Sequence, residues 1–124
     1  VVTVHVVNKG DKRIEYNVFP SKEFKQDPID GFIEITKTGT GFLKMSRKVV
    51  VDLWESNTEI KFRGKSLKNI CEYGMTKGEF VGEDITLSNK ITELGYKIWV
   101  YPHHTVSHIG NKMYRGDFKK SYNL

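Results

Sequence analysis

Residues 84–94 carry the strongest structural signal in the chain, because their apolar side chains recur at the spacing of a helix. Leu87, Ile91 and Leu94 fall on one face of such a helix. Acidic residues open its first turn, where the helix dipole favours negative charge, and Gly95 stands where helices commonly end. We therefore predict a helix over 84–94, and the rest of the fold has to cover its apolar face.

The residues that follow this helix, 96–101, alternate as a strand with two different faces does. One face carries Tyr96, Ile98 and Val100, the other carries Lys97, Trp99 and Tyr101, and Pro102 ends the run. We predict further short strands at 32–36 and 105–109. A hairpin is predicted from the β-branched and aromatic runs 1–7 and 13–19, which flank a turn-forming stretch at 8–11.

The middle of the chain predicts a second helix and then little regular structure. Ser46 is a suitable N-cap for a helix over 47–54, whose apolar face would hold Val50, Leu53 and Trp54. We predict loops at 21–30 and at 55–82, where glycines are scattered among charged residues. The predicted fold class is α/β: one domain over 1–124, with a mixed sheet of short strands and two main helices.

Charge and size limit the classes of protein that fit this chain. Its 124 residues suit one domain, and no run approaches the roughly 20 apolar residues of a membrane span. The single cysteine, Cys71, cannot form an internal disulfide, which favours a reducing, cytoplasmic setting. The net charge of +5 favours an anionic partner such as a sugar diphosphate, a nucleic acid or a membrane surface, so a peripheral position on a membrane stays open.

Four basic residues stand close together in the middle of the sequence, and they allow two interpretations. They are Lys61, Arg63, Lys65 and Lys68. A solvated surface is the commoner explanation of such a cluster, and an anion-binding surface is the alternative.

Asp84 and His108 are the residues in which the predicted fold concentrates chemistry. A helix of about 11 residues rises about 1.5 Å per residue, and a six-residue strand rises about 3.3 Å per residue. The chain therefore travels out and back by similar distances, and the start of the helix can meet the segment after the strand. A carboxylate there suits a general base and an imidazole suits a metal ligand, although helix capping and packing are the commoner explanations of such residues.

Several motifs in series resemble the C-terminal catalytic region of GT-A glycosyltransferases, including family 2-like enzymes and the polypeptide N-acetylgalactosaminyltransferases. The match covers roughly residues 38–118. The motifs are Thr38-Gly39-Thr40-Gly41-Phe42-Leu43, Ser46-Arg47, Gly82-Glu83-Asp84-Ile85, Leu94-Gly95-Tyr96-Lys97-Ile98-Trp99-Val100 and Val106-Ser107-His108-Ile109-Gly110. Their order and spacing carry the resemblance, since any one of them alone is common.

The resemblance implies a role for each of these residues. Asp84 takes the position of the base that deprotonates the acceptor hydroxyl in inverting members, and Glu83 beside it contacts the acceptor or orients the site. His108 takes the position of the histidine that completes a Mn²⁺ or Mg²⁺ site. The turn Gly39-Thr40-Gly41 lines the pocket of donor and acceptor, and Trp99 can stack on a sugar, although a partly buried core position explains Trp99 more simply.

The chain departs from these families in one respect. Their Asp-x-Asp metal motif occurs nowhere in the 124 residues, and no N-terminal nucleotide-binding half is recognised. We therefore expect the acceptor-side half of an enzyme that transfers a sugar from a nucleotide-sugar donor to a glycan or another hydroxyl acceptor, with little activity on its own. A non-catalytic basic module that binds nucleic acid or an anionic glycan is the alternative, and an exposed sheet edge predicts a homodimer.

Overall fold

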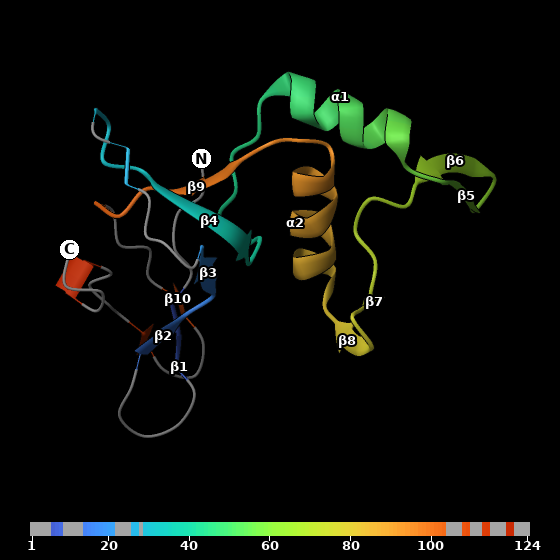
Figure 1. The fold of residues 1–124 in the computed structure, drawn as a ribbon. Coiled ribbons are helices and arrows are strands. Elements are labelled where there is room, and N and C mark those ends of the chain that lie inside the picture. The colour runs from blue at the N-terminus through green and yellow to red at the C-terminus, as the bar shows by residue number, and fades with distance from the viewer. Residues whose placement is uncertain are drawn as a thin grey trace.

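The computed structural model describes residues 6–8, 14–21, 26–27, 29–103, 108–109, 113–114 and 119–120. Short strands surround two helices in this part of the chain (Figure 1). In chain order the elements are β1 (Val6–Asn8), β2 (Ile14–Tyr16), β3 (Val18–Pro20), β4 (Ile33–Thr38), α1 (Arg47–Ser56), β5 (Glu59–Phe62), β6 (Lys65–Lys68), β7 (Gly74–Thr76), β8 (Glu79–Val81), α2 (Glu83–Glu93), β9 (Ile98–Val100), β10 (His108–Ile109) and β11 (Met113–Tyr114).

The main sheet has three described strands in the order β3-β4-β9. Both pairings are antiparallel, with Ile33 opposite Val100 and Val18 opposite Thr38. The α/β class and the two main helices are confirmed. The mixed sheet is not found among the described strands, since all of their pairings are antiparallel.

An irregularity in the pairing of β3 with β4 changes which residues of β4 face the core. The register shifts between Phe19 and Pro20, so that β4 has an extra residue at this point. Ile33 and Ile35 are buried, as alternation requires, yet beyond the shift it is Thr38 that is buried, with an exposed fraction of 2%. The bulge therefore turns the backbone of Thr38 toward the helix that covers the sheet.

Helix α2 begins and ends where the sequence predicts, within one residue. Its C-terminus is closed by two backbone hydrogen bonds, from Gly95 N–H to the Thr92 carbonyl at 2.9 Å and from Tyr96 N–H to the Ile91 carbonyl at 3.2 Å. This is the Schellman arrangement, and the φ of +84° at Gly95 is the left-handed conformation that it requires. The chain thus reverses directly into β9.

Helix α1 begins at the predicted cap, since Ser46 Oγ accepts a hydrogen bond from Val49 N–H. The predicted apolar face is only partly correct. Leu53 is 1% exposed, but Val50 and Trp54 are 43% and 47% exposed. Leu53 is the one fully buried side chain of α1, Val49 packs against the core while partly buried, and an apolar stripe of Val50, Val51 and Trp54 remains exposed.

A polar contact joins α1 to the segment after α2. The Tyr96 hydroxyl donates a hydrogen bond to the carboxylate of Asp52, and Lys48 Nζ lies 2.6 Å from the same carboxylate. The Lys48 ammonium, and then the Tyr96 hydroxyl, lower the pKa of Asp52. The Lys48–Asp52 pair is exposed and adds little to stability, whereas the partly buried Tyr96–Asp52 hydrogen bond holds α1 to the segment after α2.

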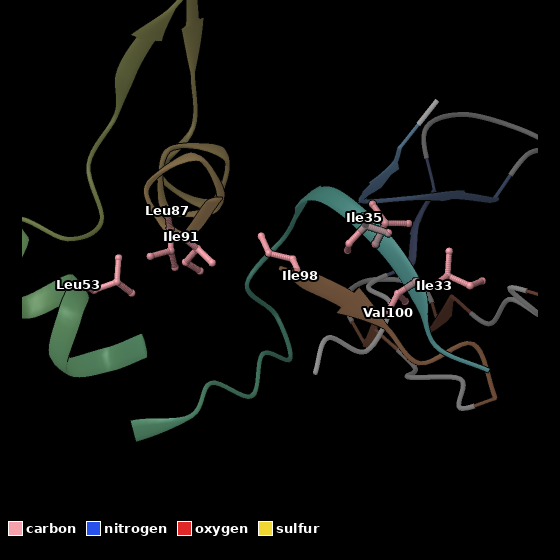
Figure 2. Packing of buried hydrophobic residues seen from close by; sticks show 8 residues of the cluster. Ile33, Ile35, Leu53, Leu87, Ile91, Ile98 and Val100 are labelled. Atoms are coloured by element: carbon pink, nitrogen blue, oxygen red, sulfur yellow. The ribbon is translucent and has the colours of Figure 1, made fainter. Parts of the chain in front are cut away.

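The core lies between the sheet and the two helices (Figure 2). Within the sheet, β4 contributes Ile33 and Ile35, β9 contributes Ile98 and Val100, and β3 contributes Val18. Leu87 and Ile91 from α2 lie between these residues and Leu53 from α1, which points toward them. Helix α2 therefore packs against both the main sheet and α1.

The prediction of an irregular segment over 55–82 is wrong. Two hairpins occupy most of it, β5–β6 and β7–β8, and they lie on the side of α2 away from the main sheet (Figure 1). Their two-residue loops are Arg63-Gly64 and Lys77-Gly78, and all four residues have positive φ. Such loops match the twist of the flanking strands, so the two basic-glycine pairs were the turn signals in this stretch.

The predicted N-terminal hairpin is confirmed in its described part, where β1 pairs antiparallel with β2. The predicted strand 13–19 is divided, because a bend at Asn17 separates β2 from β3. The strand predicted at 105–109 is described only as β10, paired with β11. In the part of the chain that the structure describes, no helix has the length and apolarity that crossing a membrane requires.

Shortening the buried side chain of α1 tests its packing. We expect Leu53→Ala to lower the free energy of unfolding by about 2–5 kcal/mol, because it removes buried methyl groups and leaves a cavity. The neighbouring Trp54→Ala is the control and should cost about 1 kcal/mol or less, since Trp54 is half exposed. Urea unfolding followed by circular dichroism measures both, and equal losses would contradict the described packing.

Candidate active site

Asp84 lies in the first turn of α2, over a glycine that begins the helix. Gly82 is the N-cap and provides no side chain to cap the helix. The carboxylate of Asp84 occupies that space, since a Cβ at Gly82 would come within 3.1 Å of Asp84 Oδ1. The same oxygen accepts a hydrogen bond from Ile85 N–H at 2.8 Å. One carboxylate oxygen is thereby held against the start of the helix.

Asn17 holds the other oxygen of this carboxylate. Its Nδ2 donates to Asp84 Oδ2 at 3.3 Å, across 67 residues of sequence. Its backbone carbonyl accepts a hydrogen bond from Gly39 N–H at 2.9 Å. Asn17 therefore connects the residue predicted as the base with the glycine turn predicted to line the same pocket.

Sequence reasoning missed Asn17, because it was assigned to a continuous strand over 13–19. A signal was present, since Asn is depleted in strands and enriched where the backbone turns. In the structure Asn17 is the bend between β2 and β3, and this bend frees its side chain to reach α2.

Gly39 is buried and has no room for a side chain. A Cβ there would lie 2.4 Å from Asn17 Nδ2 and 3.1 Å from Asn17 Cγ, well inside contact distance. The need for glycine thus comes from the closeness of Asn17. Thr40 and Gly41 follow Gly39 in the chain, and both are exposed.

The buried hydroxyl of Ser88 fixes the position of α2 along strand β4 of the sheet. Ser88 Oγ accepts the Thr38 N–H at 3.2 Å, and it lies within donating distance of the carbonyls of Asp84 at 2.9 Å and Thr38 at 3.3 Å. Ser88 and Thr38 are each 2% exposed. Because Ser88 is one turn after Asp84 and Thr38 immediately precedes Gly39, this contact brings the carboxylate to the glycine turn.

The outer side of α2 is held by a second polar cluster. Lys90 Nζ donates to the carbonyl of Asn69 at 2.7 Å and pairs with Glu72 Oε1 at 2.8 Å. The Lys90 ammonium is the main reason that the pKa of Glu72 is lowered. At the hairpin, Asn89 Nδ2 donates to Thr76 Oγ1 at 3.2 Å. The segment between the two helices is thereby tied along the length of α2.

Glu83 and Trp99 lie apart from this arrangement. Glu83 is exposed at the first residue of α2 and has no described contact with Asn17 or Gly39. Trp99 alternates with Ile98 and Val100, which face α2, so its side chain is on the other face of β9. There Lys97 Nζ stands 5.6 Å from the Trp99 ring centroid and pairs with Glu34 at 3.0 Å.

Trp99 lines a shallow depression to which Asp84 does not contribute. The depression has a volume of about 340 Å³, and its other lining residues are Asp27, Asp30 and Phe32. The Asp27 carboxylate closes a turn by accepting hydrogen bonds from the backbone N–H groups of Ile29 and Asp30. The bond from Asp30, and then the bond from Ile29, lowers the pKa of Asp27. The structure therefore separates the predicted sugar-stacking residue from the predicted base.

For His108 the structure describes only the backbone, which pairs with that of Tyr114. Its predicted role as a metal ligand falls on a side chain outside the described part. Among the described side chains, no three His, Cys, Asp or Glu residues come close enough together to hold a metal ion.

Comparisons of the chain with protein-family models, with curated proteins and with solved structures find no match. The arrangement of its own residues is therefore the basis for assigning a function.

A pair of substitutions tests the contact between Gly39 and Asn17. We expect Gly39→Ala to lower the free energy of unfolding by about 1–3 kcal/mol, because its Cβ has to displace the Asn17 side chain. Adding Asn17→Ala should recover part of this loss, since the nearest atoms are then gone. Urea unfolding of the two single variants and the double variant measures the coupling. Strictly additive losses would mean that the two residues do not meet.

Proposed function

We propose that this chain is the acceptor-side part of a glycosyltransferase and that Asp84 is its catalytic base. The observation that carries the proposal is the position of the Asp84 carboxylate, which is held by the N-terminus of α2 and by Asn17, itself bonded to the Gly39 turn. The motif resemblance assigns an acid and a glycine turn to one pocket, and these two segments are 45 residues apart in the printed sequence. Their meeting in space supports the assignment.

The geometry suits a base that takes a proton from a hydroxyl. A carboxylate accepts about four hydrogen bonds, and the contacts described for Asp84 are one to each oxygen. Capacity therefore remains for an acceptor hydroxyl, while the two bonds keep the carboxylate from rotating. A fixed base is effective because the proton transfer then needs no search for the correct orientation.

The proposed step is a displacement at the anomeric carbon of the donor sugar. The acceptor oxygen forms a bond to the anomeric carbon of the nucleotide sugar, and its proton passes to Asp84. The bond from the anomeric carbon to the diphosphate breaks, and its electron pair leaves on the phosphate oxygen. A neutral hydroxyl is a poor nucleophile, so removing its proton during attack is the contribution asked of the base.

The donor side of the reaction requires more than the described residues. No Asp-x-Asp motif is present, and the described side chains form no metal-binding group. His108 as a ligand for Mn²⁺ or Mg²⁺, Glu83 as a second acidic residue and a homodimer through an open sheet edge are further parts of the proposal.

Removing the charge of the proposed base is the direct test of its role. We expect Asp84→Asn to lower the rate of sugar transfer by about 10²–10⁴-fold, since the amide cannot accept the acceptor proton. The measurement is chromatographic detection of product from UDP-sugars and GDP-sugars with hydroxyl acceptors, for the chain as printed and for any longer protein that contains it.

Glu93→Gln supplies the matched control for this substitution. It makes the same change of charge at the exposed far end of α2, so it should leave the transfer rate unchanged. Transfer by Asp84→Asn at the wild-type rate would refute its role as base. Absence of transfer from every donor, with every form of the protein, would refute the proposed function itself.

Nucleotide binding tests the donor side separately. We expect calorimetric titration to show that UDP or GDP binds more tightly with Mn²⁺ than without it, and that His108→Ala removes this difference. His103→Ala is the control, because His103 is exposed in the turn after β9. Metal-dependent binding that survives in His108→Ala would exclude His108 as a ligand.

A further inference from the structure

We propose that hairpin β5–β6 docks the protein onto the surface of an anionic lipid bilayer. It is a site separate from Asp84, and the argument for it does not depend on the proposed function. Figure 1 shows the hairpin extending from the end of α1, away from the main sheet. All but one of its strand and turn residues are exposed.

The pairing register gives the hairpin one apolar face. Residues directly opposite each other share a face, so Ile60 lies beside Leu67 and Phe62 lies beside Lys65. Alternation places both pairs on the same side of the hairpin. Ile60 and Leu67 are each 40% exposed and Phe62 is 57% exposed. Three large apolar side chains therefore stand together in solvent on a ribbon that has no core of its own.

Basic residues lie on and beside this apolar face: Lys65 shares it, Arg63 is in the turn, and Lys61 is on the opposite face of the hairpin. Lys61, Arg63 and Lys65 are exposed, and none of them forms an ion pair with another described residue. The Arg63 guanidinium lies 5.2 Å from the centroid of the Phe62 ring at the turn. Glu59, the one acid in the hairpin, accepts a hydrogen bond from Ser66 at its base. The tip thus combines uncompensated positive charge with an apolar surface.

The base of the hairpin is anchored, so the tip is presented in a defined direction. Lys68 Nζ donates to the Asn57 carbonyl at 3.1 Å, and Asn69 N–H donates to the Thr58 carbonyl at 3.0 Å. Asn57 Nδ2 in turn donates to the carbonyl of Leu53 at 2.7 Å, at the end of α1. The two-residue turn, with positive φ at Arg63 and Gly64, keeps the loop short.

This combination fits an anionic bilayer better than the other anionic partners. At a bilayer, aliphatic and aromatic side chains enter the interface while lysine and arginine stems extend to the lipid phosphates. Single-stranded nucleic acid binds by stacking successive bases on aromatic rings, and the hairpin has only one ring, Phe62. A second copy would bring two sets of unpaired cations together, which repel each other.

The experiment is co-sedimentation of the full chain with vesicles of phosphatidylcholine, with and without phosphatidylglycerol. We expect binding only with phosphatidylglycerol, and weaker binding as salt rises. Each cation near an anionic surface contributes about fivefold, so the triple variant Lys61→Gln, Arg63→Gln, Lys65→Gln should bind on the order of a hundredfold more weakly. Phe62→Ala should lose about tenfold, because its ring no longer enters the interface.

Hairpin β7–β8 provides the matched control. It has the same kind of turn and an exposed Phe80, yet its basic turn residue Lys77 is followed two residues later by the acidic Glu79. Phe80→Ala should therefore leave vesicle binding unchanged, with circular dichroism confirming that every variant is folded. Equal binding to neutral vesicles, unchanged binding by the folded triple variant, or binding to an RNA oligonucleotide but not to vesicles would overturn the proposal.

Discussion

The hydrogen bonds between Ser88 and the backbone of Thr38 determine where helix α2 lies on the main sheet. They are buried, and leaving a buried N–H or carbonyl without a partner costs about 1–3 kcal/mol. Hydrophobic packing of Leu87 and Ile91 would hold α2 on the sheet, but it is non-directional and would tolerate sliding. The Ser88 hydroxyl prevents such sliding, because its hydrogen bonds with Thr38 form at only one position of α2 along β4. This position of α2 also determines where Asp84 lies relative to the Gly39 turn.

The bulge between β3 and β4 is the second constraint on this arrangement, and it explains why Thr38 is available. Without the shift at Pro20, regular alternation would place Lys37 on the α2 side of the sheet and Thr38 on the other. A lysine at that position would bury a charge against the helix. The extra residue in β4 thus allows one strand to carry Ile35 for packing and Thr38 for hydrogen bonding, both facing α2.

Local sequence signals predicted the parts of the fold that depend on neighbouring residues. The helix before Gly95, the cap at Ser46 and the strand before Pro102 follow from periodicity and capping chemistry, and all three are found. Contacts between distant segments could not be read in this way. Asn17 resembles any residue of a β-rich run until the bend turns it toward Asp84, and Trp54 resembles a core residue until the placement of α1 leaves it exposed. The hairpins over 55–82 were a different failure, since a basic residue in the left-handed conformation before glycine is an uncommon turn signal.

In the candidate site, too, sequence motifs name individual residues, whereas the contacts between them become visible only in the folded structure. The motif resemblance assigned Asp84 and the Gly39 turn to one pocket, and Asn17 forms hydrogen bonds with both segments. It also explains the glycine itself, since the atoms that exclude a Cβ at Gly39 belong to the side chain that orients Asp84. Trp99 shows the reverse case, because strand alternation, visible in the sequence, already placed it on the face away from Ile98 and Val100. A carboxylate held by a helix start on one oxygen and by an amide on the other is poorly explained as capping, because capping needs only the first contact. The second contact, made across 67 residues, ties Asp84 to the bend between β2 and β3, and the proposed role of Asp84 as a base rests on it.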